Sequence, residues 1–246
     1  MKATRKLIPA FAMLLIAAVM MSTATFAWFS TNSQVNVNGI TISAKANNTY
    51  LIISETASDM SLAGYTNTQV KYTTNNTFEL FPVTYFKTAP SGKTTTEGEA
   101  VDIGWYIARA AEIDASAAEE GTYTPIAEGA LEGGSYAVKK TYYIGIAENF
   151  LGATDLKVTG FTSTASAGTI VVKCGTNVSV CKSGNVDGVT LANALSAKKG
   201  ETAAVYATVE VWYFIDGEDQ FVYTNNATNL KNFTFDITFG VTAATT

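Results

Sequence analysis

The sequence contains no histidine among its 246 residues. Histidine is the commonest general base and the usual neutral metal ligand, so its absence excludes every Ser/His or Cys/His nucleophile arrangement. A zinc protease of the His-Glu-x-x-His type is excluded for the same reason. The sequence therefore predicts that the protein is not an enzyme, and we expect no cofactor.

Charged residues are also scarce, at 15% of the chain, and the formal net charge is -5. The acidic balance argues against a nucleic-acid partner. Threonine, alanine, asparagine, glycine and aromatic residues are abundant instead. This composition favours strands joined by polar turns over long surface helices, and it predicts an all-β protein.

The N-terminus has the layout of a secretory signal. Three basic residues, Lys2, Arg5 and Lys6, precede a stretch without charge from Leu7 to Phe29. Small residues follow the apolar run, and we expect cleavage after Ala27, with Ala24 as the alternative. Removal of the three positive charges takes the net charge from -5 to -8.

These features predict a signal peptide at 1–27 and a mature chain at 28–246. A signal peptidase is then a partner during export, and the location is secreted, in an extracellular matrix or at the cell surface. The alternative is an uncleaved helix, because 23 uncharged residues can span about 30 Å of hydrocarbon. Membrane contact is expected only through that uncleaved segment.

A known family has a similar junction. The run Thr25-Phe26-Ala27-Trp28-Phe29-Ser30, followed by a polar stretch and by Val37-Asn38-Gly39-Ile40-Thr41-Ile42-Ser43-Ala44, resembles the TasA and camelysin family. The resemblance covers about the first 45 residues closely. It implies export from a Gram-positive bacterium through the dedicated signal peptidase SipW, with cutting before Trp28. It also implies a subunit of a biofilm-matrix or surface fibre.

Period-two alternation is the main structural signal in the mature chain. Its best instance is Phe233, Phe235, Ile237, Phe239 and Val241, which alternate with polar residues and predict a half-buried strand. A second set shares one face of a strand: Val205, Ala207, Val209, Val211, Tyr213 and Ile215. On its opposite face, Trp212 and Phe214 then need separate cover.

Other runs of the same kind bring the expected total to nine or ten strands. They lie near Val35 to Ala46, Tyr50 to Ser54, Phe78 to Phe86, Val101 to Ala108, Tyr136 to Ile146, Leu156 to Thr162 and Thr169 to Cys174. Residues 89–99 read as a surface loop, and residues 107–120 as either a short helix or a loop. We therefore predict one domain at 28–246, a jelly-roll-like antiparallel β-sandwich that follows the hydrophobic signal helix.

The two cysteines, Cys174 and Cys181, lie seven residues apart. Export would take them to a compartment where a disulfide persists, and a bridge would stabilise the fold by about 2 to 3 kcal/mol. The alternative is a pair of free thiols on neighbouring strands. Neither reading suggests redox catalysis, because the spacing is not that of a thioredoxin-like motif.

A cluster of acidic residues, Asp216, Glu218 and Asp219, is a weak candidate for calcium. The alternative is a solvated hairpin tip, because Asp216-Gly217 precedes another aromatic run at Phe221 to Tyr223. The spaced acidic loop of a calcium site and its terminal glutamate are missing. No other metal site is expected.

Cleavage before Trp28 would create a new N-terminal strand in which Phe29, Val35 and Val37 share one face. A strand that begins with two aromatic residues needs a pairing partner. It could pair within its own sheet, or it could add to the next subunit in a head-to-tail fibre. The resemblance implies the second arrangement, with Trp28, Phe29, Val35 and Val37 in the donor strand.

We therefore expect a self-assembling, secreted structural protein. The main alternative is a monomeric, surface-displayed adhesin or binding module whose aromatic residues stack on glycans or a host protein. A type IV pilin is disfavoured, because the apolar segment carries no acidic residue and the small residues follow that segment.

Overall fold

The structure is a computed structural model that describes residues 35–46, 50–62, 64–108, 123–132, 135–148, 150–165, 167–197, 206–219 and 233–243. These parts of the chain form thirteen strands and two short 3-10 helices. The strands are β1 (Val35–Ala46), β2 (Leu51–Ser54), β3 (Gln69–Leu80), β4 (Thr84–Phe86), β5 (Gly104–Ala108), β6 (Tyr123–Pro125), β7 (Ala137–Ile146), β8 (Gly152–Ser163), β9 (Gly168–Cys174), β10 (Asn177–Lys182), β11 (Thr190–Ser196), β12 (Ala207–Ile215) and β13 (Phe233–Ala243). The 3-10 helices are η1 (Ala57–Ser61) and η2 (Glu128–Ala130). The prediction of a nearly all-β chain is confirmed.

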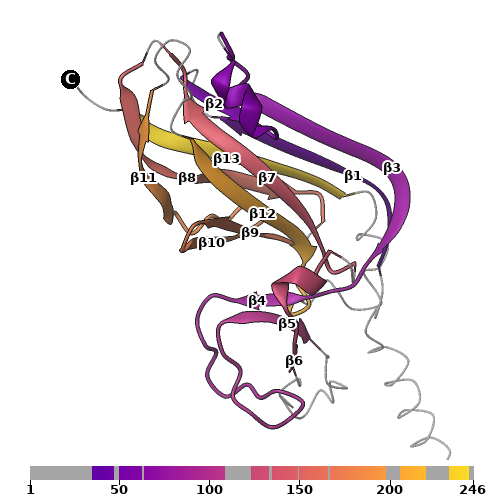
Figure 1. Cartoon of the computed structure of the whole chain (residues 1–246). Coiled ribbons are helices and arrows are strands. Elements are labelled where there is room, and N and C mark those ends of the chain that lie inside the picture. Colours follow the sequence, from indigo (N-terminus) through magenta and orange to yellow (C-terminus); the bar gives the residue numbers. More distant parts are fainter. Residues whose placement is uncertain are drawn as a thin grey trace, which may run out of the picture.

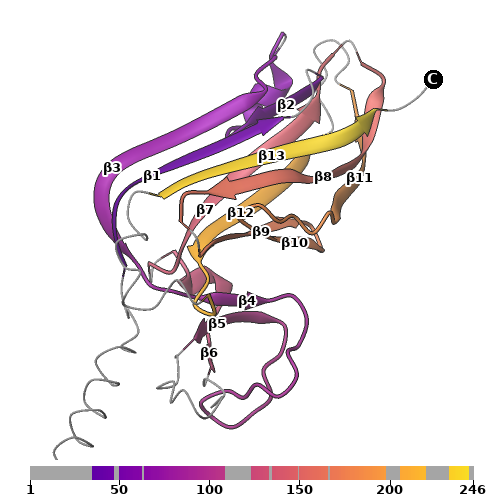
Figure 2. The ribbon, with the colours of Figure 1, turned by 180° about the vertical axis from the view of Figure 1, so that it is seen from behind.

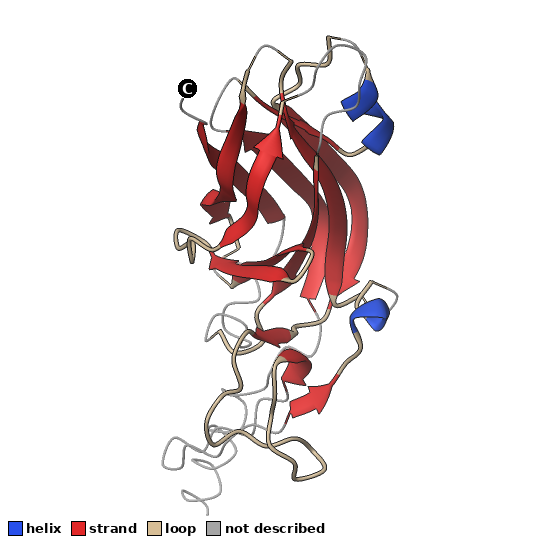
Figure 3. Ribbon diagram, turned by 60° about the vertical axis from the view of Figure 1, so that its left-hand side comes forward, coloured by secondary structure: helices blue, strands red, loops and turns tan. Residues whose placement is uncertain are grey.

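Ten of the strands form two five-stranded sheets that enclose a common core (Figure 3). Sheet 1 has the order β11-β8-β13-β1-β3, and sheet 2 has the order β10-β9-β12-β7-β2. Both sheets contribute buried side chains to the same cluster. The arrangement is compatible with a β-sandwich, and the two sheets together are called the sandwich below.

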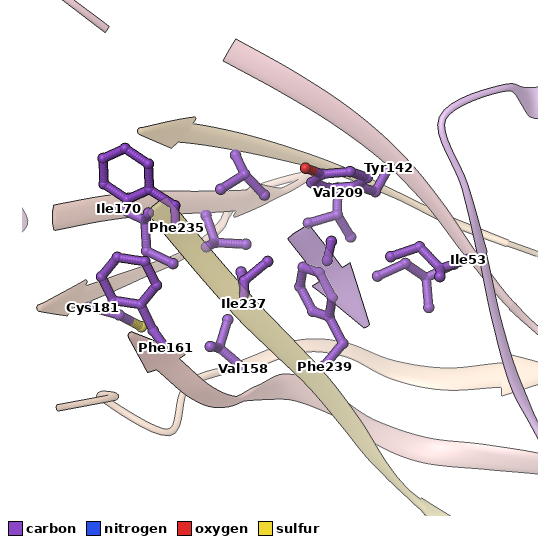
Figure 4. Close-up of a cluster of buried hydrophobic side chains, with 14 of the residues drawn as sticks. Ile53, Tyr142, Val158, Phe161, Ile170, Cys181, Val209, Phe235, Ile237 and Phe239 are labelled. Atoms are coloured by element: carbon purple, nitrogen blue, oxygen red, sulfur yellow. The ribbon is translucent and has the colours of Figure 1, made fainter. Parts of the chain in front are cut away.

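The core of the sandwich consists almost entirely of apolar side chains (Figure 4). Phe235, Ile237 and Phe239 of β13 are fully buried, as is Val209 of β12. One polar contact in the core is a pair of phenols, because the hydroxyls of Tyr142 and Tyr213 lie 3.0 Å apart and share a hydrogen bond. Burial raises the pKa of Tyr213 well above its ordinary value, so both groups remain neutral in the core.

The alternation in the sequence predicted the inward faces correctly. In β12 the buried core residues are Ala207, Val209, Val211, Tyr213 and Ile215. On the opposite face, Trp212 and Phe214 are covered by a second apolar cluster that includes Val83, Trp105 and Leu131. The expectation that these two side chains need separate cover is therefore confirmed.

The prediction of an antiparallel sandwich needs one correction. All but one of the strand pairs within the sandwich are antiparallel, but β1 and β13 run parallel, with Ile40 opposite Phe233 and Ala46 opposite Phe239. The long connection permits this pairing, because parallel strands cannot be joined by a short hairpin and β1 and β13 are the first and last described strands.

A small three-stranded sheet, with the order β4-β5-β6, lies beyond one end of the sandwich (Figure 1). We call the described residues between Val83 and Leu131 the lobe. The lobe has a small cluster of its own, formed by Val101, Tyr106 and Tyr123 with Phe86 packed against it. The alternation in the sequence did not predict this separate sheet.

The expected strand at Phe78 to Phe86 is divided in the structure. Its first residues end β3 and its last residues form β4. Pro82 lies at the break, where its missing N–H and fixed φ favour the interruption of a strand. The loop expected at 89–99 is confirmed as the connection between β4 and β5, whereas most of the segment at 107–120 lies outside the described residues.

Candidate assembly site

The strand β1 is an internal strand of sheet 1, next to the edge strand β3 (Figure 2). It pairs with β13 on one side and with β3 on the other. Ile40, Ile42 and Ala44 are each at most 1% exposed and belong to the main core. The first strand of the described chain is therefore an internal part of the sandwich.

The beginning of β1 extends beyond its partner β13. Pairing with β13 starts at Ile40, whereas pairing with β3 starts at Val35, which lies opposite Leu80. A register shift between Asn38 and Ile40 separates the two parts of the strand. In the described part of the chain, Val35–Asn38 thus pairs on one side only.

The structure brings together only half of the proposed donor segment. Val35 and Val37 lie in β1 and pair with Leu80 and Phe78 of the same subunit. Ala27, Trp28 and Phe29, which include the expected cleavage point, lie outside the described residues. The strand that we expected to be donated therefore pairs, from Val35 onward, within its own sheet.

The strand β3 forms one edge of sheet 1. It is twelve residues long, and within the described ranges its only ladder partner is β1. A long edge strand presents a row of backbone donors and acceptors that a further strand can use. Most of this strand was not predicted from the sequence, because Asn75 and Asn76 are residues typical of turns.

The structure contradicts the proposed disulfide. Cys174 and Cys181 are both free thiols, on the adjacent strands β9 and β10. The register places Cys181 opposite Ile170, four residues along β9 from Cys174. At about 3.3 Å per residue this offset far exceeds the Cα separation that a disulfide tolerates. Burial raises the pKa of both thiols, which lowers their reactivity.

The structure gives the calcium candidate no support, because two of its three carboxylates, Asp216 and Glu218, have other partners. Asp216 is 6% exposed; its Oδ1 accepts a hydrogen bond from the Thr84 hydroxyl at 2.7 Å, and its Oδ2 lies 2.7 Å from Lys182 Nζ. Glu218 pairs with Lys93 and accepts a hydrogen bond from the Tyr123 hydroxyl. Within the described ranges, no group of three potential ligands is arranged to hold a metal.

The turn predicted at Asp216-Gly217 is present, since the Asp219 amide donates to the Asp216 carbonyl at 3.0 Å. The aromatic run that was expected to complete a hairpin lies outside the described residues. The turn instead fastens the lobe to the sandwich through Asp216 and Glu218. No local pattern could have revealed these contacts, because Thr84 and Asp216 are 132 residues apart.

A second carboxylate, Asp187, makes a similar contact between the lobe and the sandwich. Its Oδ2 lies 2.7 Å from Lys87 Nζ, and its Oδ1 accepts from the Ser179 hydroxyl at 2.5 Å. Burial alone would raise the pKa of this carboxyl group. The hydrogen bonds from Lys87, Ser179 and two backbone amides outweigh burial, so the pKa of Asp187 is lowered.

Comparisons with known proteins do not assign the chain to a family. No protein-family model matches it, and no curated protein or solved structure gives a significant match. The resemblance to the TasA and camelysin family therefore still depends on the residues around Trp28. No helix in the described ranges is long and apolar enough to cross a membrane.

Proposed function

We propose that this chain is an exported structural protein, a self-assembling subunit of a cell-surface or extracellular filament or biofilm matrix. Subunits are joined by strand donation from the N-terminal part of the mature chain. Residues 1–27 serve as the signal peptide, and SipW-type processing releases Trp28 as the first residue. The proposal rests on the sequence of the junction and on the position of β1.

The fold we propose is a jelly-roll-like sandwich. Its support is the path of the chain, which changes sheet at almost every step. The strands β1, β3, β8, β11 and β13 belong to sheet 1, and they alternate along the chain with the strands of sheet 2. The hairpin of β9 and β10 is the exception among the described strands of the sandwich. Repeated crossing between two sheets is typical of jelly rolls.

The observation that carries the proposal is the position of β1 between β13 and β3. Without β1, β13 and β3 would each lose a pairing partner, and the core would lose Ile40, Ile42 and Ala44. The gap would have the length, register and side-chain pockets of this one strand. The same strand from a second copy fits that gap by construction, because exchange of an identical element reproduces every contact.

Strand exchange of this kind joins subunits firmly. Backbone hydrogen bonds to β13 and β3 provide affinity, and the buried side chains of β1 set the register. Because each subunit receives a strand from one neighbour and donates its own strand to a different neighbour, the contact does not close and yields a head-to-tail fibre. The proposal thus extends the donor segment from Trp28 through the whole of β1 to Ala46.

The connection from β1 to β2 limits the geometry of such a fibre. Ala46 and Leu51 are five residues apart, so a fully extended connection spans at most about 18 Å. A donating subunit must therefore lie in direct contact with its acceptor. The proposal accordingly predicts compact filaments without a visible linker between subunits.

The test compares three versions of the mature chain, which begin at Trp28, at Val35 and at Asn47. We expect filaments by electron microscopy from the first two. The third lacks β1, and we expect it to remain unassembled and to bind a synthetic peptide of residues 35–46. The matched control peptide carries Ile42→Asp, which places a charge in the core, and should not bind.

The other outcomes are equally informative. If the chain that begins at Val35 stays monomeric while the chain that begins at Trp28 assembles, residues 28–34 link the subunits instead of β1. If the chain that begins at Trp28 remains monomeric at high concentration, the filament proposal fails. A surface-displayed binding module is then the better account, although Trp105 and Trp212 are buried and unavailable for stacking on a ligand.

A further inference from the structure

The lobe is an insertion whose two ends lie together. The chain enters it after β3 and leaves it before β7. At this point the Phe81 amide donates to the Ser135 carbonyl at 2.8 Å, and the rings of Phe81 and Tyr136 lie 5.6 Å apart. A unit attached through two adjacent segments can rotate about that attachment without a change in the sheets beside it.

The lobe and the sandwich have separate cores. Among the described residues, no residue of the lobe belongs to the main core of the sandwich. The cluster formed by Val101, Tyr106 and Tyr123 belongs wholly to the lobe. The second apolar cluster, which covers Trp212 and Phe214, joins the two parts. Its buried residues are Val83, Trp105 and Leu131 from the lobe and Ala137, Val171, Trp212 and Phe214 from the outer face of sheet 2.

This joining cluster has the composition of an interface that can open. At its centre the ring of Trp105 packs against Trp212, with centroids 6.2 Å apart, and against Phe214, with centroids 4.9 Å apart. Around the centre, three partly exposed ion pairs cross from the lobe to the sandwich: Lys87 with Asp187, Lys93 with Glu218 and Lys173 with Glu128. An aromatic centre with a charged rim is typical of reversible protein interfaces.

An independent observation points the same way. The indole N–H groups of Trp105 and Trp212 are both buried and have no hydrogen-bond partner. One comes from each side of the interface. A buried donor without an acceptor opposes the closed state, because the same group is hydrogen-bonded to water when exposed. Two such groups in one small cluster make docking of the lobe onto sheet 2 less favourable.

We propose that the lobe is a latch that opens from sheet 2 as a unit while the sandwich remains folded. Opening breaks the backbone hydrogen bonds from Val83 N–H to the Ile215 carbonyl and from Gly217 N–H to the Val83 carbonyl. It exposes an apolar face of sheet 2 that includes Val171, Trp212 and Phe214. This opening goes beyond the proposed assembly function and does not require it.

Hydrogen exchange followed by mass spectrometry tests the proposal on the full mature chain. We expect peptides that contain Val83 and Gly217 to exchange faster than peptides from β13 and from the paired strands β7 and β12. Glu128→Gln removes an ion pair that crosses the interface, and it should speed exchange at Val83 and Gly217 about two- to fivefold. It should leave exchange in β13 unchanged.

The matched control is Glu210→Gln. Glu210 pairs with Lys139 at 2.5 Å, is exposed to the same degree as Glu128, and lies within sheet 2 instead of across the interface. We expect this control to leave exchange at Val83 unaltered. If the peptides of the lobe and of the sandwich exchange at one common rate, and both variants change that rate equally, the latch proposal is wrong.

A second readout does not depend on backbone exchange. In a Trp28→Phe background the remaining tryptophans are Trp105 and Trp212, both in the interface. Opening should shift their emission to longer wavelength at a denaturant concentration below that of global unfolding. A single transition, seen at the same denaturant concentration by tryptophan emission and by far-ultraviolet circular dichroism, would contradict the proposal.

Discussion

The sandwich and the lobe are built on opposite principles. The sandwich buries long aliphatic and aromatic rows from both sheets, with the phenol pair of Tyr142 and Tyr213 as an internal polar contact. The lobe has a core of only a few residues and depends on the outer face of sheet 2 for cover. The sandwich is thus stabilised from within, whereas the lobe is stabilised by docking.

The largest effect should come from the core of the sandwich. Phe235→Ala removes a fully buried ring and should lower the free energy of unfolding by about 3 to 5 kcal/mol. Urea denaturation measures this change. The matched control is Thr238→Ala on the outward face of the same strand, which we expect to stay within about 0.5 kcal/mol of the parent. Equal effects of the two variants would contradict the assignment of inward and outward faces.

The next effect separates the two regions. Trp105→Ala removes the centre of the interface and should free the lobe, with a loss of about 3 kcal/mol or more confined to lobe docking. Limited proteolysis should then cut within the lobe, while the sandwich keeps its circular dichroism spectrum. Trp105→Phe retains a ring and removes one unpaired N–H group, and it should cost much less. Loss of the whole fold on Trp105→Ala would show that the lobe is part of the sandwich core.

A smaller effect is expected from the buried carboxylate at the junction. Asp216→Ala leaves the Thr84 hydroxyl and Lys182 without their acceptor, and it should cost about 1 to 3 kcal/mol. Thr84→Val removes a single hydrogen bond at nearly constant volume and should cost about 1 kcal/mol. Chemical denaturation of both variants tests this order. Added calcium should leave the parent's midpoint unchanged, and a calcium-dependent increase would restore the calcium hypothesis.

The pH dependence of docking should be weaker still. The pKa of Asp187 is lowered in the folded chain, so this group stabilises the fold above its unfolded pKa of about 4, and that contribution disappears as the pH falls through the folded value. We expect at most about 1 kcal/mol, because the group is partly exposed. Asp187→Asn should remove this part of the acid sensitivity. The measurement is lobe opening by tryptophan emission between pH 5 and pH 2.

Treatment with a reducing agent should have the smallest effect on stability. Because Cys174 and Cys181 are free thiols, a reducing agent should not change the unfolding temperature. Alkylation of the denatured, unreduced chain should label both cysteines. A single disulfide, detected by mass, would mean that the register of β9 and β10 differs from the one described here.

The strands of the sandwich were predicted well, because the alternation of apolar and polar residues that marks a strand lies within a few consecutive positions. Phe235, Ile237 and Phe239 alternate with polar residues, and this pattern alone marks one face of a strand as buried. The same pattern revealed that Trp212 and Phe214 need cover, but not that Trp105 supplies it. The ion pairs between the lobe and the sandwich join residues 45 to 125 positions apart, and contacts at such separations have no periodic signature, so they were not predicted.

Two other features of the structure could not be predicted from the sequence, each for a specific reason. The parallel pairing of β1 and β13 depends on which sheet each strand joins, and alternation does not carry that information. The spacing of Cys174 and Cys181 allowed a bridge, but only the register of β9 against β10 shows that the thiols lie four residues apart along the ladder. The site at β1 was predicted in part, since Val35 and Val37 were assigned to a strand whose partner the sequence could not choose.

The pairing of β1 with β13 also determines when the chain can fold. Ile40 and Phe233 are 193 residues apart, so sheet 1 closes only after almost the whole chain is available. Contacts between such distant residues give a high contact order and slow folding. Until β13 is made, Ile40 and Ile42 lack one of the two strands that flank β1 in sheet 1. The topology itself therefore delays the completion of sheet 1 until almost the whole chain has been made.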